Sequence, residues 1–189
     1  MSSQALWYLS RATGLVSFLV LSLVVILGAV IKRNGKVRGL PRFAAVGLHR
    51  NAALFALALL GIHIVTAVVD PYVSIGWATV VIPFVSAYEP LALGLGALAI
   101  DLTIAVVITS LLRFRIGLRL WRAVHWLAYA IWPLAAIHGI AAARDLRTGG
   151  LLDLVLATMT AVVIVVAWRF AEDPADQRRP GVTRRARSI

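Results

Sequence analysis

Four histidines are the residues of this sequence best suited to chemistry, and all four fall in long apolar segments. His49 and His63 lie in one segment, and His125 and His138 lie in another. Neutral imidazole is a common metal ligand, and polar groups inside a membrane are costly and usually face a functional interior. A single intramembrane histidine is more often a structural residue, but two in each of two segments indicate a ligand set.

The segments that must position these histidines are long enough to cross a bilayer. Hydrophobic residues make up 61% of the 189 residues and charged residues 14%, and apolar runs of about 20 residues span the hydrocarbon core. We expect helices, because an open strand leaves its backbone unsatisfied in lipid. The predicted fold class is all-α, a polytopic membrane helix bundle of about five transmembrane helices: Trp7 to Ile31, Phe43 to Val69, Leu91 to Leu112, Leu120 to Ala143 and Leu151 to Trp168.

The remaining segments are short. Residues 75–85 include Pro83 and are expected to form a re-entrant or interfacial segment rather than a span. The N-terminal run is read as a mature span, because it lacks a basic residue before Arg11 and is too long for a signal peptide. We therefore expect a transmembrane domain over residues 1–170 and a basic, disordered cytoplasmic tail over residues 171–189.

The net charge of +11 reports orientation rather than nucleic-acid binding. If the spans alternate, 16 of the 19 basic residues fall on one side. By the positive-inside rule, the N-terminus is then outside and the C-terminus is cytoplasmic. The only further partner implied by this charge is anionic membrane lipid. With no cysteine, thiolate metal sites and disulfides are excluded, and no phosphate-binding glycine loop is present.

Spacing places the histidines at two matching depths. The second and fourth spans run parallel, and at 1.5 Å per residue the two histidines of each span lie about 20 Å apart along the axis. His49 therefore faces His125 near the cytoplasmic side, and His63 faces His138 near the outer side. Such pairs suit two planar macrocycles, each held by one imidazole from each helix.

Rotation is a stricter test of this pairing. Fourteen residues leave His63 about 40° from the face of His49, but thirteen leave His138 about 140° from the face of His125 in an ideal helix. Pro133 lies between the latter two and interrupts the helical hydrogen bonds. The pairing therefore predicts a distortion around Tyr129 to Pro133.

These features resemble the ferric reductase-like transmembrane domain superfamily, over nearly all of residues 8–170. The similarity includes His-x13-His and His-x12-His, the second within "IGLRLWRAVHWLAYAIWPLAAIH" from Ile116, and the short segments "RATG" at 11–14 and "VITS" at 107–110. The superfamily includes NADPH oxidases, ferric reductases and the heme-binding membrane subunit of the bacterial periplasmic methionine sulfoxide reductase system. The resemblance implies two b-type hemes, an inner one on His49 and His125 and an outer one on His63 and His138.

The resemblance also implies transmembrane electron transfer in a bacterial plasma membrane. Larger members have six helices and a flavin and nicotinamide module, whereas this chain has five expected spans. We therefore expect a separate cytoplasmic flavoprotein or a membrane quinol as donor, and an extracytoplasmic redox acceptor. Two alternatives stay open: a ferric-iron or oxygen reductase acting at the outer heme edge, and a non-redox heme-carrying scaffold. No catalytic residue is predicted.

Several other residues are weaker candidates. Arginines at the span ends are placed to pair with heme propionates: Arg50, Arg119 and Arg122 inside, and Arg11 or Arg144 outside. Asp101 lies in mid-span and either relays protons or stays protonated and bonds a hydroxyl. A group of aromatic residues and a group of glycines either line the cofactors or simply pack helices. The aromatic residues are Trp121, Trp126, Tyr129 and Trp132, and the glycines are Gly47, Gly61, Gly94, Gly96 and Gly139.

Overall fold

The computed structural model describes residues 3–32, 41–71, 73, 75–143 and 149–171. This part of the chain contains helices and no strand. The helices are α1 (Ser3–Lys32), α2 (Arg42–Val69), α3 (Trp77–Val81), α4 (Pro90–Leu111), α5 (Arg113–Ile116), α6 (Leu118–His125), α7 (Ala128–Ala142) and α8 (Gly149–Phe170).

Among the described residues, five helical segments are long and apolar enough to cross a membrane: α1, α2, α4, the pair α6 and α7 taken together, and α8. Their bounds differ from the expected spans by a few residues at most, and α2 ends at Val69 as expected. The chain is therefore an all-α, multi-pass membrane protein, as predicted. The expected tail over residues 171–189 lies almost wholly outside the described residues.

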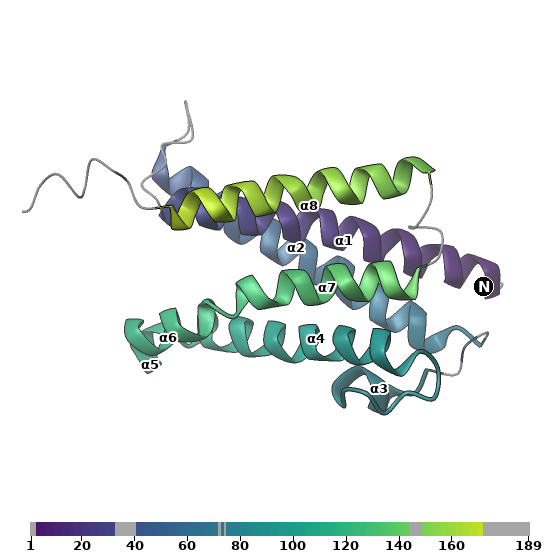
Figure 1. Cartoon of the computed structure of the whole chain (residues 1–189). Helices are drawn as coiled ribbons and strands as arrows, with labels where there is room; N and C mark the ends of the chain where they lie inside the picture. Colours follow the sequence, from purple (N-terminus) through teal and green to yellow (C-terminus); the bar gives the residue numbers. More distant parts are fainter. Residues whose placement is uncertain (1–2, 33–40, 72, 74, 144–148, 172–189) are drawn as a thin grey trace, which may run out of the picture.

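The helices associate mainly as two pairs. α1 packs along α2, and α4 packs along α7, while α8 lies on α1 (Figure 1). A buried cluster of Val25, Trp132 and Val162 joins α1, α7 and α8. The indole Nε1 of Trp132 also donates a hydrogen bond to Ser22 Oγ at 2.8 Å, which ties α7 to α1. The two pairs are thus fastened along one side.

The fourth span is interrupted, but not where the sequence predicted. The break lies at Trp126 and Leu127, between α6 and α7, whereas Pro133 lies inside the continuous helix α7. The expected distortion at Tyr129 to Pro133 was therefore placed too late in the chain. The amide of Leu127 bonds to the carbonyl of Val124 at 2.9 Å, and that of Tyr129 to Trp126 at 3.1 Å. These three-residue bonds wind the helix more tightly than α-helical bonds, which rotates His138 toward the face of His125.

The segment before α4 contains only the five-residue helix α3, which packs against α4. The ring of Phe84 fills the space where a side chain at Gly94 would lie. Gly94 therefore seats this segment on the bundle rather than making room for a cofactor. A five-residue helix is too short to cross the membrane, which agrees with a segment that does not form a sixth span.

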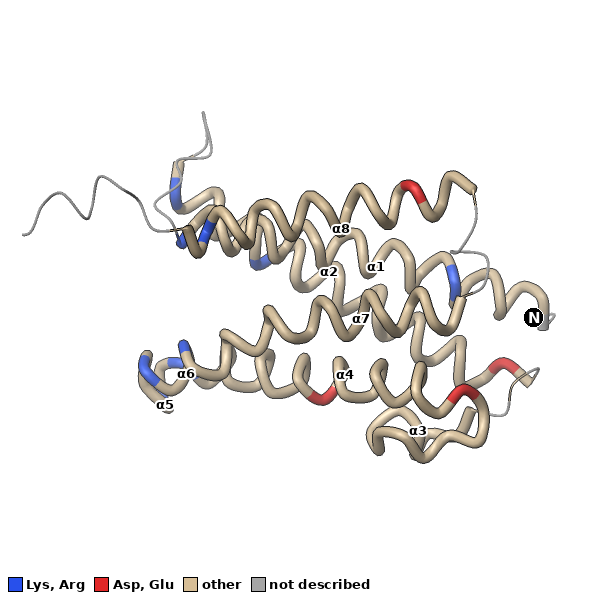
Figure 2. The backbone as a smooth tube through the Cα atoms, in the orientation of Figure 1, with Lys and Arg blue, Asp and Glu red and all other residues tan. Residues whose placement is uncertain are grey.

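Charged side chains separate toward the two ends of the bundle (Figure 2). Described basic residues gather at the end that holds α5 and α6, whereas most of the described acidic residues lie toward the end that holds α3 (Figure 2). Arg11 lies in the N-terminal part of α1, and Asp101 lies midway along α4. This separation is what the positive-inside rule uses to orient a membrane protein.

Cysteine labelling tests this orientation, since the natural chain has no cysteine. Ala87 and Phe114 are exposed at opposite ends of the bundle. In intact cells, we expect a membrane-impermeant maleimide to label an Ala87→Cys variant and not a Phe114→Cys variant, because the basic end should face the cytoplasm. Both variants should react after the cells are opened. The reverse labelling pattern would invert the topology.

Candidate functional site

The four histidines lie in two facing pairs, one pair above the other along the bundle. The ring centroids of His49 and His125 are 6.4 Å apart, with the ring planes inclined by 64°. Those of His63 and His138 are 6.3 Å apart and inclined by 72°. The structure thus brings the residues together in the pairs expected from their depths, each with one histidine from α2 and one from α6 or α7.

Three of the imidazoles are held by a backbone carbonyl of a neighbouring helix. The Nδ1 atoms of His49, His63 and His138 lie 3.1, 2.8 and 2.8 Å from the carbonyl oxygens of Val24, Ser10 and Ala92. Because a carbonyl can only accept, each Nδ1 must carry the proton and donate. The other ring nitrogen, Nε2, is then left with a lone pair. Metal-binding histidines characteristically have this arrangement, which fixes both tautomer and ring orientation.

Glycines in α1 and α4 make these contacts possible. A Cβ atom at Gly14 would lie 2.8 Å from His63 Nδ1, and one at Gly96 would lie 2.8 Å from His138 Nδ1. At Gly28 the equivalent atom would lie 3.3 Å from Cε1 of His49. Any larger residue at the first two positions would collide with the ring. His63 and His138 therefore reach their carbonyls because Gly14 and Gly96 lack a side chain, and a side chain at Gly28 would make a tight contact with His49.

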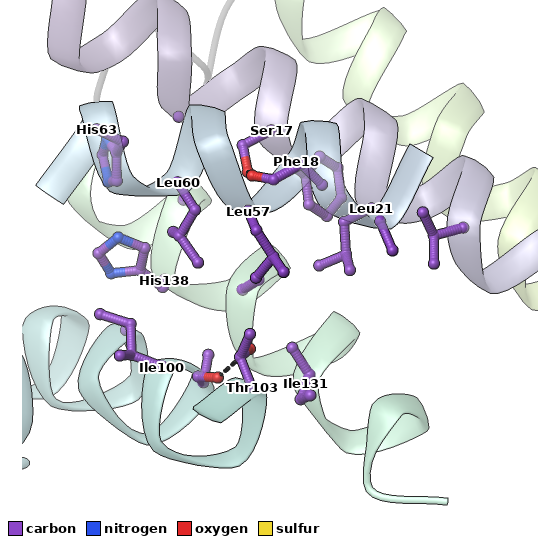
Figure 3. Close-up of a pocket in the computed structure, with 18 of the residues that line it drawn as sticks. Ser17, Phe18, Leu21, Leu57, Leu60, His63, Ile100, Thr103, Ile131 and His138 are labelled. Atoms are coloured by element: carbon purple, nitrogen blue, oxygen red, sulfur yellow. Dashed lines mark hydrogen bonds between the residues drawn. The ribbon is translucent and has the colours of Figure 1, made fainter. Parts of the chain in front are cut away.

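A large cavity separates the histidines of each pair and extends along the bundle. Its volume is about 2040 Å³, and all four histidines line it. Its walls near the outer pair are mainly apolar, including Leu57, Leu60 and Ile100 (Figure 3). Ligand pockets usually measure about 300–1,000 Å³. The cavity is therefore large enough for two sizeable flat ligands rather than one.

The donor set fits a metal that brings its own equatorial ligands. An imidazole nitrogen binds a first-row metal ion at about 2 Å, so two rings on opposite sides of one ion have centroids about 6 Å apart. Both observed separations match this value. Within the described residues, no group of three or more histidines and carboxylates can hold a bare ion. Two axial imidazoles in an apolar cavity suit the iron of a heme.

Basic side chains line the cavity at the end that holds His49 and His125. Arg50 and Arg122, both expected there, line it, whereas Arg119 does not. Arg113 and Arg169 also line it and were not predicted, since arginines at span ends are common. Toward the other end, Arg11 lines the cavity and its guanidinium lies 4.3 Å from the Trp7 ring centroid. Arg144 lies outside the described residues.

The other candidates divide into those that line the cavity and those that do not. Asp101 is partly buried but is not part of the cavity wall. Trp132 is a packing residue, stacked on Phe18 with ring centroids 5.9 Å apart. The remaining aromatic candidates line the cavity, as do three of the glycines, and these residues are Trp121, Trp126, Tyr129, Gly47, Gly96 and Gly139. Gly61 has no neighbour within 4 Å of a built Cβ and does not line the cavity.

Gly14 and Gly28 lie against the histidines but were not among the glycines that the sequence analysis selected as candidates. Their spacing of fourteen residues equals that of His49 and His63 in the neighbouring helix, and this match was the signal available. Gly14 also ends the "RATG" segment. A glycine spacing gains meaning only when it is compared with the histidine spacing of another span.

Comparison with known protein families gives a match. The family described as ferric reductase-like transmembrane component matches residues 13–136. The matched range includes three of the four histidines and ends two residues before His138. No match was found among curated proteins or solved structures. The matched range covers more than half of the 189 residues, and the chain therefore belongs to the family of ferric reductase-like transmembrane components.

Proposed function

We propose that this protein conducts electrons across the membrane through two b-type hemes. The inner heme is held by His49 and His125, and the outer heme by His63 and His138. Electrons enter at the basic end from a separate flavoprotein or a membrane quinol, and they leave at the other end to an extracytoplasmic acceptor. The family assignment supports a redox role in the membrane, since its transmembrane domains typically bind heme.

The observation that carries the proposal is the pair of facing imidazoles repeated at two depths. Each pair has the ring separation of two axial ligands on one metal ion. Fourteen residues of helix separate His49 from His63, which corresponds to about 21 Å along α2. One pair lies near each end of the bundle, so both sides of a membrane are within reach of a cofactor.

The protein's own groups orient the ligands. His49 with His125, and His63 with His138, would each hold one heme, and a heme held in this way would supply one-electron transfer. The carbonyls of Ser10 and Ala92 fix both outer imidazoles. Burial of the ligands and hydrogen bonding to them are the properties through which the protein would set the potential.

The basic end suits an acidic donor and a cofactor's carboxylates. Arg50 and Arg122 line the cavity beside the inner pair and are exposed at the same time. A cationic rim accelerates the approach of an acidic partner, and arginine binds carboxylates strongly. These properties favour this end for electron entry and for the heme propionates.

Heme stoichiometry tests the two sites directly. A pyridine hemochrome assay on the purified protein should give about two b-type hemes per chain, since two pairs of axial ligands are available. His63→Ala and His138→Ala variants should each retain about one heme with a low-spin spectrum. If these variants kept both hemes with unchanged spectra, the outer assignment would be wrong.

Gly14→Ala tests whether the glycines serve the ligands. The added Cβ would lie 2.8 Å from His63 Nδ1, so the ring must move off its carbonyl. Disturbing such an outer-shell contact typically weakens metal binding by about 10–100-fold. We expect a loss of that order in outer heme affinity, measured by heme titration of the apoprotein. Gly61→Ala, with no atom within 4 Å, is the matched control and should bind both hemes normally.

The donor can be tested by rapid mixing. Hemes accept one electron at a time, whereas NADPH delivers a hydride, so a flavin or quinone must separate the two electrons. NADPH alone should therefore leave the hemes of the purified, flavin-free chain oxidised. A membrane quinol or a flavoprotein reductase should reduce them, which stopped-flow absorbance at the Soret band would record. Rapid reduction by NADPH alone would contradict a separate donor.

A further inference from the structure

Three of the four histidines follow one register rule. Each donates through Nδ1 to a carbonyl located four residues before a glycine: Ser10 before Gly14, Val24 before Gly28, and Ala92 before Gly96. The reason is geometric. Every Cα–Cβ bond of an α-helix tilts toward the N-terminus, so the side chain one turn later covers a carbonyl. A glycine at that position leaves the carbonyl open to a second donor.

The rule predicts the fourth contact. The two carbonyls on α1 are fourteen residues apart, at Ser10 and Val24, and fourteen residues after Ala92 on α4 is Val106. His125 should therefore donate to the carbonyl of Val106, and the position four residues later should be glycine. That position is Ser110, which ends the "VITS" segment. Ser110 thus stands where the other three contacts have a glycine.

The contact is not made. The hydroxyl of Ser110 donates to the Val106 carbonyl at 2.6 Å, and the hydroxyl of Thr109 approaches the same oxygen at 3.2 Å. The Nδ1 atom of His125 is buried and is the one buried side-chain nitrogen or oxygen of the described residues that has no hydrogen-bond partner. A buried unpaired donor is costly and rare.

Ser110 also holds the aromatic neighbour of His125. Its hydroxyl accepts a hydrogen bond from Trp121 Nε1 at 3.3 Å. The Trp121 ring lies against His125 with centroids 5.1 Å apart and planes inclined by 31°. At this ligand, a neighbouring tilted indole takes the place of the carbonyl that orients each of the other three imidazoles. The indole of Trp121 still positions His125, but Nδ1 of His125 donates no hydrogen bond.

We propose that Ser110 is a positioning residue that tunes the inner site, by covering the Val106 carbonyl and keeping His125 without an Nδ1 hydrogen bond. This rests on the proposed function, because it concerns the ligand of the inner heme. A hydrogen bond from Nδ1 makes an imidazole a stronger donor to a metal, and a stronger donor stabilises the oxidised iron. Withholding the bond therefore raises the potential at which the inner iron accepts its one electron.

The test is a spectroelectrochemical titration of the purified full-length chain, in which each iron takes one electron from the electrode. The Ser110→Gly variant uncovers the carbonyl, so His125 gains the bond. We expect the equilibrium constant for reducing the inner iron to fall about tenfold, which is about 59 mV for a one-electron couple. A His138→Ala background, which lacks the outer heme, identifies the inner potential.

A reciprocal variant gives the opposite sign and does not depend on the fold tolerating the first. Gly28→Ser places a side chain over the carbonyl of Val24, and the added Cβ would lie 3.3 Å from His49, which is a tight contact rather than a collision. His49 then loses its bond, and the inner potential should rise. In both variants the outer potential should stay unchanged, since Gly14 and Gly96 are untouched.

Two further variants separate covering from other effects. Ser110→Ala removes the hydroxyl but keeps the Cβ over the carbonyl, so the inner potential should shift much less than in Ser110→Gly. Thr109→Val removes the second hydroxyl near Val106 and should leave both potentials unchanged. An unchanged inner potential in Ser110→Gly and Gly28→Ser, or equal shifts in Ser110→Ala and Ser110→Gly, would overturn the role of Ser110. A chain that binds no heme would overturn the proposed function itself.

Discussion

The arrangement of this bundle depends on one kind of contact, a histidine N–H donated to a backbone carbonyl that is already part of a neighbouring helix. A carbonyl oxygen has two lone pairs and can accept both bonds, but only if the two helices approach closely. α1 therefore lies tightly on α2, and α4 on α7. These contacts turn the Nδ1 edge of each imidazole toward the neighbouring helix. The other ring nitrogen, Nε2, then faces the cavity between the two histidines of the pair.

The sequence predicted the helices and the histidine pairs because both depend on simple periodicities. Apolar length marks a span, and the rise of a helix places His49 with His125 and His63 with His138. Glycine roles were not predictable in this way. Gly14 and Gly61 look alike in sequence, since small residues are common in membrane helices, yet one lies against His63 and the other has no neighbour. Only the packing of a second helix distinguishes them.

The break in the fourth span follows from the position of the histidines on the second span. Its histidines are thirteen residues apart, one fewer than the fourteen that separate His49 from His63. Both pairs must nevertheless meet across the same cavity. The chain adjusts at Trp126 and Leu127, directly after His125, where three-residue hydrogen bonds add rotation. Pro133 alone suggested a distortion nearer to itself, because the sequence did not show which turn was free to change.

The same register appears twice along the chain, in α1 with α2 and in α4 with α6 and α7. Each half supplies one histidine at each depth, so neither half alone forms either pair. A cofactor bridging such a pair would therefore fasten the two halves together, in addition to the buried cluster of Val25, Trp132 and Val162. Within this register, the two halves differ at Ser110 and at the break after His125, and both differences lie beside the same inner ligand. The repeated histidine–carbonyl register would make the inner and outer sites alike. Ser110 is the position at which this chain makes the inner site chemically different from the outer one.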